Sequence, residues 1–208
     1  MARTNQQDLD GAIKDFSKAI TMELKAAGDS LYLIGPRFDE LGGSEYYRTA
    51  LHETGANVPI VRFDLERSMI YAVIDAIDEG LLAAAHDISN GGLAASICEM
   101  ALVRPARFGV DLNLDLVQGS DGGDGGGGEG GSQEAGLRTD RLLFSESSGF
   151  VLEARKGKEA RLAELLAGYG LTAMQIGTVT GKRRIVMARS ERTIVDLDLD
   201  QAKEAWTA

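Results

Sequence analysis

The sequence predicts a layered α+β domain in which helices flank a central sheet. Segments with alternating apolar residues, typical of strands, are interspersed with segments whose apolar residues recur every three or four positions, typical of helices. The order of these segments lacks a strict β-α-β repeat, which favours an α+β class over a doubly wound one. The chain has 208 residues, of which 44% are apolar and three are proline, and such a length can bury a sizeable core.

The first half of the chain begins with helical periodicity. Apolar residues spaced by three and four positions, from Leu9 to Leu24, predict an amphipathic helix over 8–27, which Gly28 can end. The elements expected next are a strand over 30–35, a helix over 45–54, a strand over 58–64 and a helix capped by Asp64 and ended by Gly80.

The second half opens on LLAAAHDIS (81–89), a continuous apolar run that predicts a strand covered on both faces. Two glycines then open the next helix. The elements expected from there on are a helix over 93–103, a strand over 108–117, two strands over 141–146 and 149–154, a helix over 157–168, a hairpin over 174–189, and a final strand and short helix.

Charge and composition exclude several classes of protein. The chain carries 32 acidic and 22 basic residues, a net charge of −10, which disfavours non-specific binding to nucleic acid or anionic membranes. No apolar run approaches the roughly 18 residues that span a bilayer, and the N-terminus lacks the apolar core of a secretory signal. We therefore expect a cytoplasmic protein with no membrane partner. The single cysteine, Cys98, is expected to be a packed and inert thiol.

Glycine is concentrated in one acidic segment. Residues 119–131 hold 9 of the 26 glycines, and such a run cannot compensate for its ordering entropy, so we expect a disordered surface loop over about 118–136. The Asp and Glu side chains of this segment would repel phosphate. The expected organisation is an N-terminal helix or linker over 1–29 followed by one domain over 30–208.

The most informative segment for function is HDISNGGL (86–93). A buried strand delivers Asp87 and Ser89 to its end, and two glycines then turn the backbone into a helix whose first N–H groups are unpaired. Such a helix start favours a phosphate, and Asp87 could hold Mg²⁺ against it. The alternative is a capped helix start, with Ser89 or Asn90 as the N-cap and His86 in the core. The candidate phosphate-binding residues here are Ser89, Asn90, Gly91 and Gly92.

Two further loops repeat this chemistry at strand ends. DELGGSEY (39–46) places two glycines and a serine before a helix, and SESSG (145–149) lies between two short apolar segments. A plain capping loop and a polar turn are the respective alternatives. Together the three loops predict one composite phosphate-binding rim. The candidate residues of these two loops are Gly42, Gly43, Ser44, Glu146, Ser147 and Ser148.

Several stretches resemble a known family. MELKAAGDSLYLIG, DELGGSEYY, AHDISNGGLAASICEMAL and RLLFSESSGF, in this order, are similar to the second synthetase-type repeat of phosphoribosylformylglycinamidine synthase. The resemblance covers about residues 22–117 and 140–189. It implies the C-terminal half domain of that repeat, with the layered α/β/α fold of AIR synthase-related proteins.

The resemblance also implies an activity. The family uses ATP and Mg²⁺ to phosphorylate the amide oxygen of formylglycinamide ribonucleotide, and ammonia from a glutaminase domain or subunit then gives the amidine. Asp87 matches a position that binds Mg²⁺ in the first repeat, and residues 146–148 match a turn that touches substrate there. Asn90 stands where the family often has aspartate, and the glycine-rich loop departs from the family pattern.

The resemblance assigns no catalytic residue to this half domain. The expected partners are the missing N-terminal half domains, the glutaminase and further copies of the chain. Two alternatives stay open: a scaffolding or auxiliary nucleotide-binding module of the same complex, and another enzyme of the AIR synthase superfamily.

Overall fold

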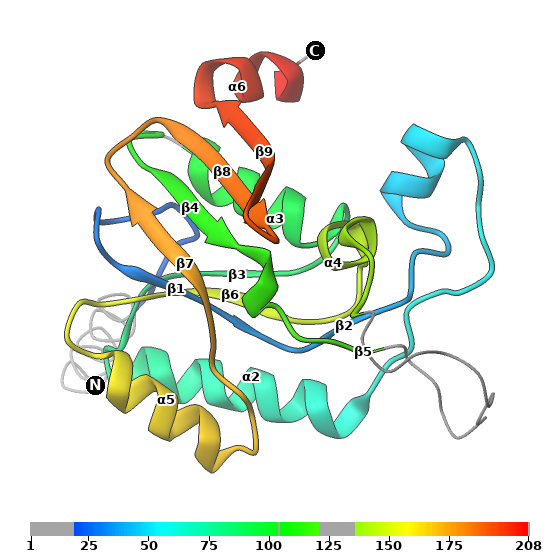
Figure 1. Cartoon of the computed structure of the whole chain (residues 1–208). Coiled ribbons are helices and arrows are strands. Elements are labelled where there is room, and N and C mark those ends of the chain that lie inside the picture. Colours follow the sequence, from blue (N-terminus) through cyan, green and yellow to red (C-terminus); the bar gives the residue numbers. More distant parts are fainter. Residues whose placement is uncertain (1–18, 104, 121–135, 208) are drawn as a thin grey trace, which may run out of the picture.

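A computed structural model of the chain describes residues 19–103, 105–120 and 136–207 (Figure 1). Within these residues the main sheet has seven strands in the order β3-β6-β1-β7-β4-β8-β9. All neighbouring strands are antiparallel except β4 and β8, which are parallel. The strands are β1 (Ser30–Ile34), β3 (Leu82–Asp87), β4 (Gly109–Asn113), β6 (Phe150–Ala154), β7 (Met174–Thr180), β8 (Arg184–Arg189) and β9 (Arg192–Asp198).

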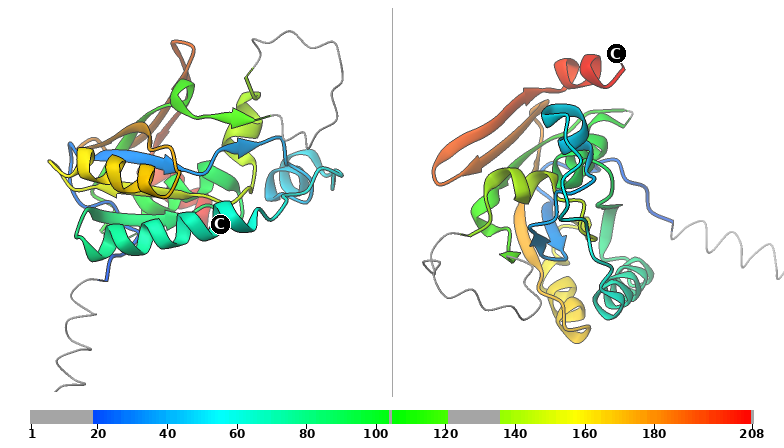
Figure 2. Two further views of the ribbon diagram at one scale, coloured as in Figure 1. Left: turned by 90° about the horizontal axis from the view of Figure 1, so that it is seen from below. Right: turned by 90° about the vertical axis from the view of Figure 1, so that its right-hand side faces the viewer.

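Helices cover the sheet on both faces, in agreement with the predicted layered domain whose sheet is flanked by helices (Figures 1 and 2). One face carries α2 (Phe63–Asp78) and α5 (Glu159–Gly168), and the other carries α3 (Gly92–Leu102), α4 (Thr139–Phe144) and α6 (Leu199–Thr207). The smaller elements are β2 (Arg37–Phe38), which pairs with β5 (Gly119–Ser120), the π-helix η1 (Tyr47–Leu51) and the 3₁₀-helix η2 (Leu114–Leu116).

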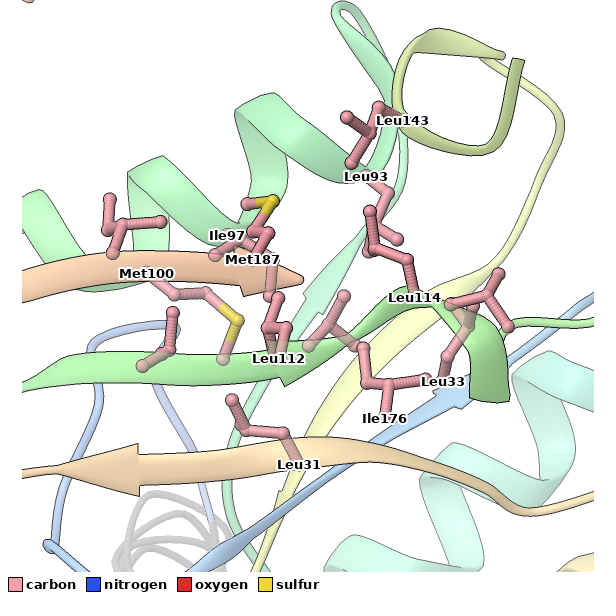
Figure 3. Close-up of a cluster of buried hydrophobic side chains, with 14 of the residues drawn as sticks. Leu31, Leu33, Leu93, Ile97, Met100, Leu112, Leu114, Leu143, Ile176 and Met187 are labelled. Atoms are coloured by element: carbon pink, nitrogen blue, oxygen red, sulfur yellow. The ribbon is translucent and has the colours of Figure 1, made fainter. Parts of the chain in front are cut away.

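Two hydrophobic clusters lie on opposite faces of the sheet, and strand β1 shows why. Successive side chains of a strand point to opposite faces. Leu31 and Leu33 therefore join the cluster beneath α3 and α4, while Tyr32 and Ile34 pack against α2 and α5. Figure 3 shows the first cluster, in which Leu93 and Ile97 of α3 face the sheet. All four residues of β1 named here are buried, so the predicted strand is confirmed.

The start of the described chain differs from the expected helix over 8–27. Residues 8–18 lie outside the described residues, and residues 19–27 are not helical. Thr21 forms an isolated bridge with Ala84, and the backbone N–H groups of Lys25 and Ala26 donate to the carboxylate of Glu153. These bonds tether the segment to the sheet, so the helical periodicity is overridden by tertiary contacts.

The predicted strand over 58–64 is also wrong. Residues 57–62 pair with no strand of the described chain, and Val58 and Val61 remain more than half exposed. Helix α2 begins at Phe63, so Asp64 lies in its first turn and is not its N-cap. β-Branched residues predict a strand only where a neighbouring strand is available to pair with them.

Of the segment over 141–146, expected to be a strand, residues 141–144 belong to helix α4 and residues 145–146 follow it without regular structure. Leu142 and Leu143 are both buried in the cluster beneath α3. In a strand these neighbours would point to opposite faces, whereas in a helix they can share one face. Packing on α3 therefore decides the conformation. The second of the two strands expected here, over 149–154, is present as β6.

The pairing of the two strands expected as a hairpin over 174–189 is wrong. β7 and β8 are both strands, but β4 lies between them and pairs with each. Gly109 allows this arrangement, because a Cβ there would lie 2.0 Å from the carbonyl oxygen of Arg184 and 2.3 Å from that of Lys182. The chain between β7 and β8 thus passes close over the start of β4.

Most of the remaining predicted elements are confirmed, with ends that shift by one to a few residues. The expected strand over 108–117 divides into β4 and η2. Most of the glycine-rich loop, residues 121–135, lies outside the described residues, and Gly119–Ser120 before it forms β5. Among the helices described, none is long and apolar enough to cross a membrane.

Candidate functional site

The three predicted loops meet at the carboxylate of Glu146. Its Oε1 atom accepts a hydrogen bond from the backbone N–H of Glu45 at 2.9 Å and from that of Gly91 at 2.8 Å. Both donors stand at helix starts, where N–H groups lack an intrahelical partner and carry partial positive charge. We call the three loops, residues 39–46, 87–92 and 145–149, the rim. The predicted convergence of these loops is present in the structure.

The helix start at 86–93 depends on its two glycines. Gly91 and Gly92 have φ of +80° and +68°, a region that favours glycine. A Cβ on Gly92 would lie 2.7 Å from the carbonyl oxygen of Leu143 and 2.8 Å from that of Ser145. The N-cap of α3 is Gly91, and within the described chain no side chain caps this helix. The alternative in which Ser89 or Asn90 is the N-cap is therefore wrong; both are exposed.

Asp87 lies beside the rim's hydrogen-bond network rather than in it. Its side chain is 62% exposed, and one carboxylate oxygen is 3.3 Å from Nδ1 of His86. His86 Nε2 is in turn 2.8 Å from a carboxylate oxygen of Glu99 on α3. In the described residues no cluster of three or more His, Cys, Asp or Glu side chains could by itself hold a metal ion. Magnesium commonly takes only one or two carboxylates together with phosphate and water, and Asp87 fits that role.

The glycine pair at 42–43 has its N–H groups engaged inside the protein. Gly42 donates to the carbonyl oxygen of Asn57 at 2.7 Å, and Gly43 donates to that of Thr54 at 2.6 Å. The Ser44 hydroxyl donates to the carbonyl oxygen of Leu41 and accepts from the N–H of Tyr47. Ser44 is thus a capping residue that is almost fully buried, as the alternative for this loop proposed.

The turn at 145–149 is held by a buried polar network that the sequence motifs did not reveal. The hydroxyl of Ser147 donates to the Glu40 carboxylate at 2.7 Å, and Glu40 forms an ion pair with Arg62 at 2.6 Å. Ser148 donates to Glu66 at 3.0 Å. Ser147 is 1% exposed and therefore faces inward, whereas Ser148 is exposed.

Arg37 supports the same turn from the interior of the protein. It is fully buried, and its guanidinium donates to the carbonyl oxygens of Ser148, at 2.7 Å, and Ser145, at 3.4 Å. Burial lowers its pKa to about 10, and the nearby Glu40 partly opposes that shift, so the group stays charged at neutral pH. An arginine after a strand-ending Gly-Pro carries no signal of burial, which explains why sequence reasoning missed it.

Comparisons with known proteins place these features in a family context. The PurL subunit of phosphoribosylformylglycinamidine synthase from Methanothrix thermoacetophila is 50% identical over 199 residues, covering 95% of this chain and 23% of that protein. A solved structure of Thermotoga maritima PurL complexed with FGAR superimposes with a TM-score of 0.68 at 16% identity, covering 89% of this chain and 29% of that one. In a PurLQS structure from the same organism the TM-score is 0.66 at 15% identity, with 89% and 28% covered.

These matches agree with the resemblance noted in the sequence. The chain spans about a quarter of the length of the curated relatives it matches. The family model described as "AIR synthase related protein, C-terminal domain" matches residues 26–189. Because that match covers most of the chain, the chain belongs to the family of AIR synthase-related C-terminal domains.

Proposed function

We propose that this domain is part of an ATP-dependent C–N ligase of purine biosynthesis, which converts formylglycinamide ribonucleotide to formylglycinamidine ribonucleotide. The observation that carries the proposal is the 50% identity to a PurL subunit over 95% of the chain. The domain would supply the rim to a nucleotide site that other parts of the synthetase complete. We assign no catalytic residue to it, and the isolated chain is expected to catalyse nothing.

The rim supports phosphate binding by its position and chemistry. It gathers the exposed Ser89, Asn90 and Ser148 at one end of the sheet, next to the start of α3. A bound Mg²⁺ would neutralise phosphate charge, and Asp87 is the exposed carboxylate that would hold it. The buried network beneath Ser147 keeps the turn rigid for that purpose.

A specific observation favours the second candidate, a scaffolding or auxiliary module. The backbone N–H groups of Gly42, Gly43 and Ser44 are bonded inside the protein. The same holds for Gly91, through Glu146, and for Gly92, which donates to the carbonyl oxygen of Ser89. In this reading the rim only joins three loops, and its glycines serve the backbone geometry.

Calorimetric titration separates the two functions. The purified chain is titrated with Mg-ATP and Mg-ADP beside Asp87→Ala, with Glu164→Ala on α5 as the control, because Glu164 is an exposed carboxylate on the opposite face of the sheet. Saturable heat that Asp87→Ala abolishes and Glu164→Ala preserves supports the nucleotide site. Absence of heat from the unaltered chain favours either the scaffolding function or a site that only the missing N-terminal half domain completes. Repeating the titration with that half domain added in trans separates the two: heat that then appears supports the nucleotide site, and continued absence of heat supports scaffolding.

The proposed partners are the rest of the synthetase, a glutaminase and further copies of the chain. Helix α2 presents Phe63, Ile70, Tyr71 and Ile74 on its surface, and Phe63 is 80% exposed. Exposed apolar patches of this kind mark interaction surfaces. Sedimentation velocity tests self-association: we expect Phe63→Ser to lower the association constant, and a strictly monomeric profile of the unaltered chain at high concentration would contradict it.

A further inference from the structure

The rim contains the one asparagine of the sequence that is followed by glycine, Asn90. The other three, Asn5, Asn57 and Asn113, precede glutamine, valine and leucine. An asparagine amide is lost without an enzyme when the backbone nitrogen of the next residue attacks the side chain, and glycine, which lacks a Cβ, hinders that attack least. Asn90 is exposed and lies in the turn between β3 and α3. Water therefore has access to the amide that would react.

The reaction at Asn90 needs no reactant other than water. The Gly91 nitrogen loses its proton and bonds to Cγ of Asn90, which expels ammonia and closes a cyclic succinimide. Water then opens this ring at either carbonyl carbon. The product is aspartate, or isoaspartate, in which the main chain runs through Cβ and Cγ. In the net change an amide and a water molecule become a carboxylate and an ammonium ion.

The folded structure restrains both movements that this reaction needs. The Gly91 N–H, which must lose its proton, donates to Oε1 of Glu146 at 2.8 Å. The Gly92 N–H donates to the carbonyl oxygen of Ser89 at 3.0 Å and closes a turn with Asn90 and Gly91 at its centre. Gly91 has φ +80° and ψ 1°, as in the third residue of a type II turn. Ring closure requires rotation about the bond between Cα and the carbonyl carbon of Asn90, and the closed turn opposes that rotation.

We propose that Asn90 is a site of deamidation and that the carboxylate of Glu146 protects it. Conversion then proceeds only from molecules in which the loop has opened locally and the Gly91 N–H has left Glu146. Hydrogen bonds to charged acceptors are strong enough that the loss of one raises the population of open molecules about tenfold or more. The modification requires no nucleotide and is therefore independent of the proposed function.

The product would alter the rim. A carboxylate at position 90 adds a negative charge to the loop that carries the exposed Asp87. Isoaspartate also lengthens the main chain immediately before Gly91, which moves the Gly91 N–H away from Glu146. The contact that joins residues 87–92 to residues 145–149 is then lost. Converted molecules should therefore exchange the hydrogen of the Gly91 amide faster than unconverted ones.

Peptide mass spectrometry measures the reaction in the full chain. The purified protein is incubated at mildly alkaline pH, and the fraction of the peptide containing residues 86–93 that has gained the mass of an amide-to-acid change is followed in time. Asn57 and Asn113, read in the same digest, are internal controls and should stay unconverted. Asn90→Gln should abolish the change in this peptide. The chain unfolded in urea gives the unrestrained rate, which should exceed the rate of the folded chain about tenfold to a hundredfold.

Variants of Glu146 test the protection. Glu146→Ala should speed conversion in the folded chain about tenfold, and Glu146→Gln, which keeps an acceptor oxygen without the charge, should speed it less. Glu164→Ala, the control, removes an exposed carboxylate from α5 on the opposite face of the sheet and should leave the rate unchanged. Circular dichroism checks that each variant is folded during the incubation.

Four results overturn the proposal. They are equal rates in the folded and unfolded chains, an unchanged rate in both Glu146 variants, a slower rate in Glu146→Ala, and a folded chain that stays unconverted through about a hundred half-times of the unfolded chain. The slower rate would make Glu146 a base that assists the loss of the Gly91 proton, which contradicts protection. The last result would mean that Asn90 is no site of modification in the folded protein.

Discussion

Glu153 provides a pH-dependent stability that can be worked out from the structure. Its side chain is fully buried in β6, where the carboxylate accepts the N–H groups of Lys25 and Ala26 at 2.9 to 3.1 Å. Burial raises its pKa from 4.5 to about 7, with a further contribution from the nearby Asp29, although the two N–H donors oppose the shift. The perturbation is Glu153→Gln, which keeps an acceptor oxygen and cannot ionise.

The sign and size of this pH dependence follow from the linkage between proton binding and folding. A raised pKa means that the folded state holds the proton more tightly than the unfolded chain. The stabilisation of the fold by protonated Glu153 is complete below pH 4.5 and is lost as the pH rises through about 7. Each pKa unit corresponds to about 1.4 kcal/mol, so the full shift of about 2.5 units amounts to about 3.5 kcal/mol at most. The free energy of unfolding of the unaltered chain, relative to Glu153→Gln, should fall by this amount across that window.

Urea unfolding followed by circular dichroism at several pH values measures the difference. Glu204→Gln, which removes a carboxylate at an exposed position on α6, is the matched control. A pH-independent difference for Glu153→Gln would refute the reasoning. It would mean that the carboxylate titrates at the same pH in the folded and unfolded chains.

Three further predictions concern the rim and the thiol of Cys98. Gly92→Ala should destabilise the fold by about 3 kcal/mol, from positive φ and backbone clashes. Gly157→Ala, at φ +81° with open space, should cost about 1 kcal/mol in the same urea titration; equal losses would exclude the clash as the cause. Glu146→Ala should cost about 2 kcal/mol and speed hydrogen exchange at the Gly91 amide, with a smaller effect for Glu146→Gln; unchanged exchange would mean that the Glu146 carboxylate does not hold the loops. Because the pKa of Cys98 is raised to about 11, a thiol reagent at about pH 8 should react at least about a hundredfold more slowly than with free cysteine, and a comparable rate would contradict its burial.

Local sequence patterns determined several secondary-structure elements of this protein and the loops that form the rim. The apolar run in residues 30–34, the glycine pair before 93–102 and the leucine spacing in 159–168 were sufficient to place β1, α3 and α5, because the structure buries the apolar side chains of each segment. The glycine pair at 91–92 likewise indicated a tight turn into a helix, and both residues have positive φ. The three loops were recognised as one rim because each follows a strand or precedes a helix with similar chemistry.

Only the tertiary structure decided which segments meet. Residues 141–144 became helical because Leu142 and Leu143 pack together beneath α3, and β4 separated β7 from β8 because Gly109 lets the chain pass close over its start. The contact of Glu146 with Gly91 joins residues 55 positions apart. Sequence periodicity reports the burial of a segment's own faces, whereas partners distant in the chain are selected by packing and by the need to pair every buried polar group.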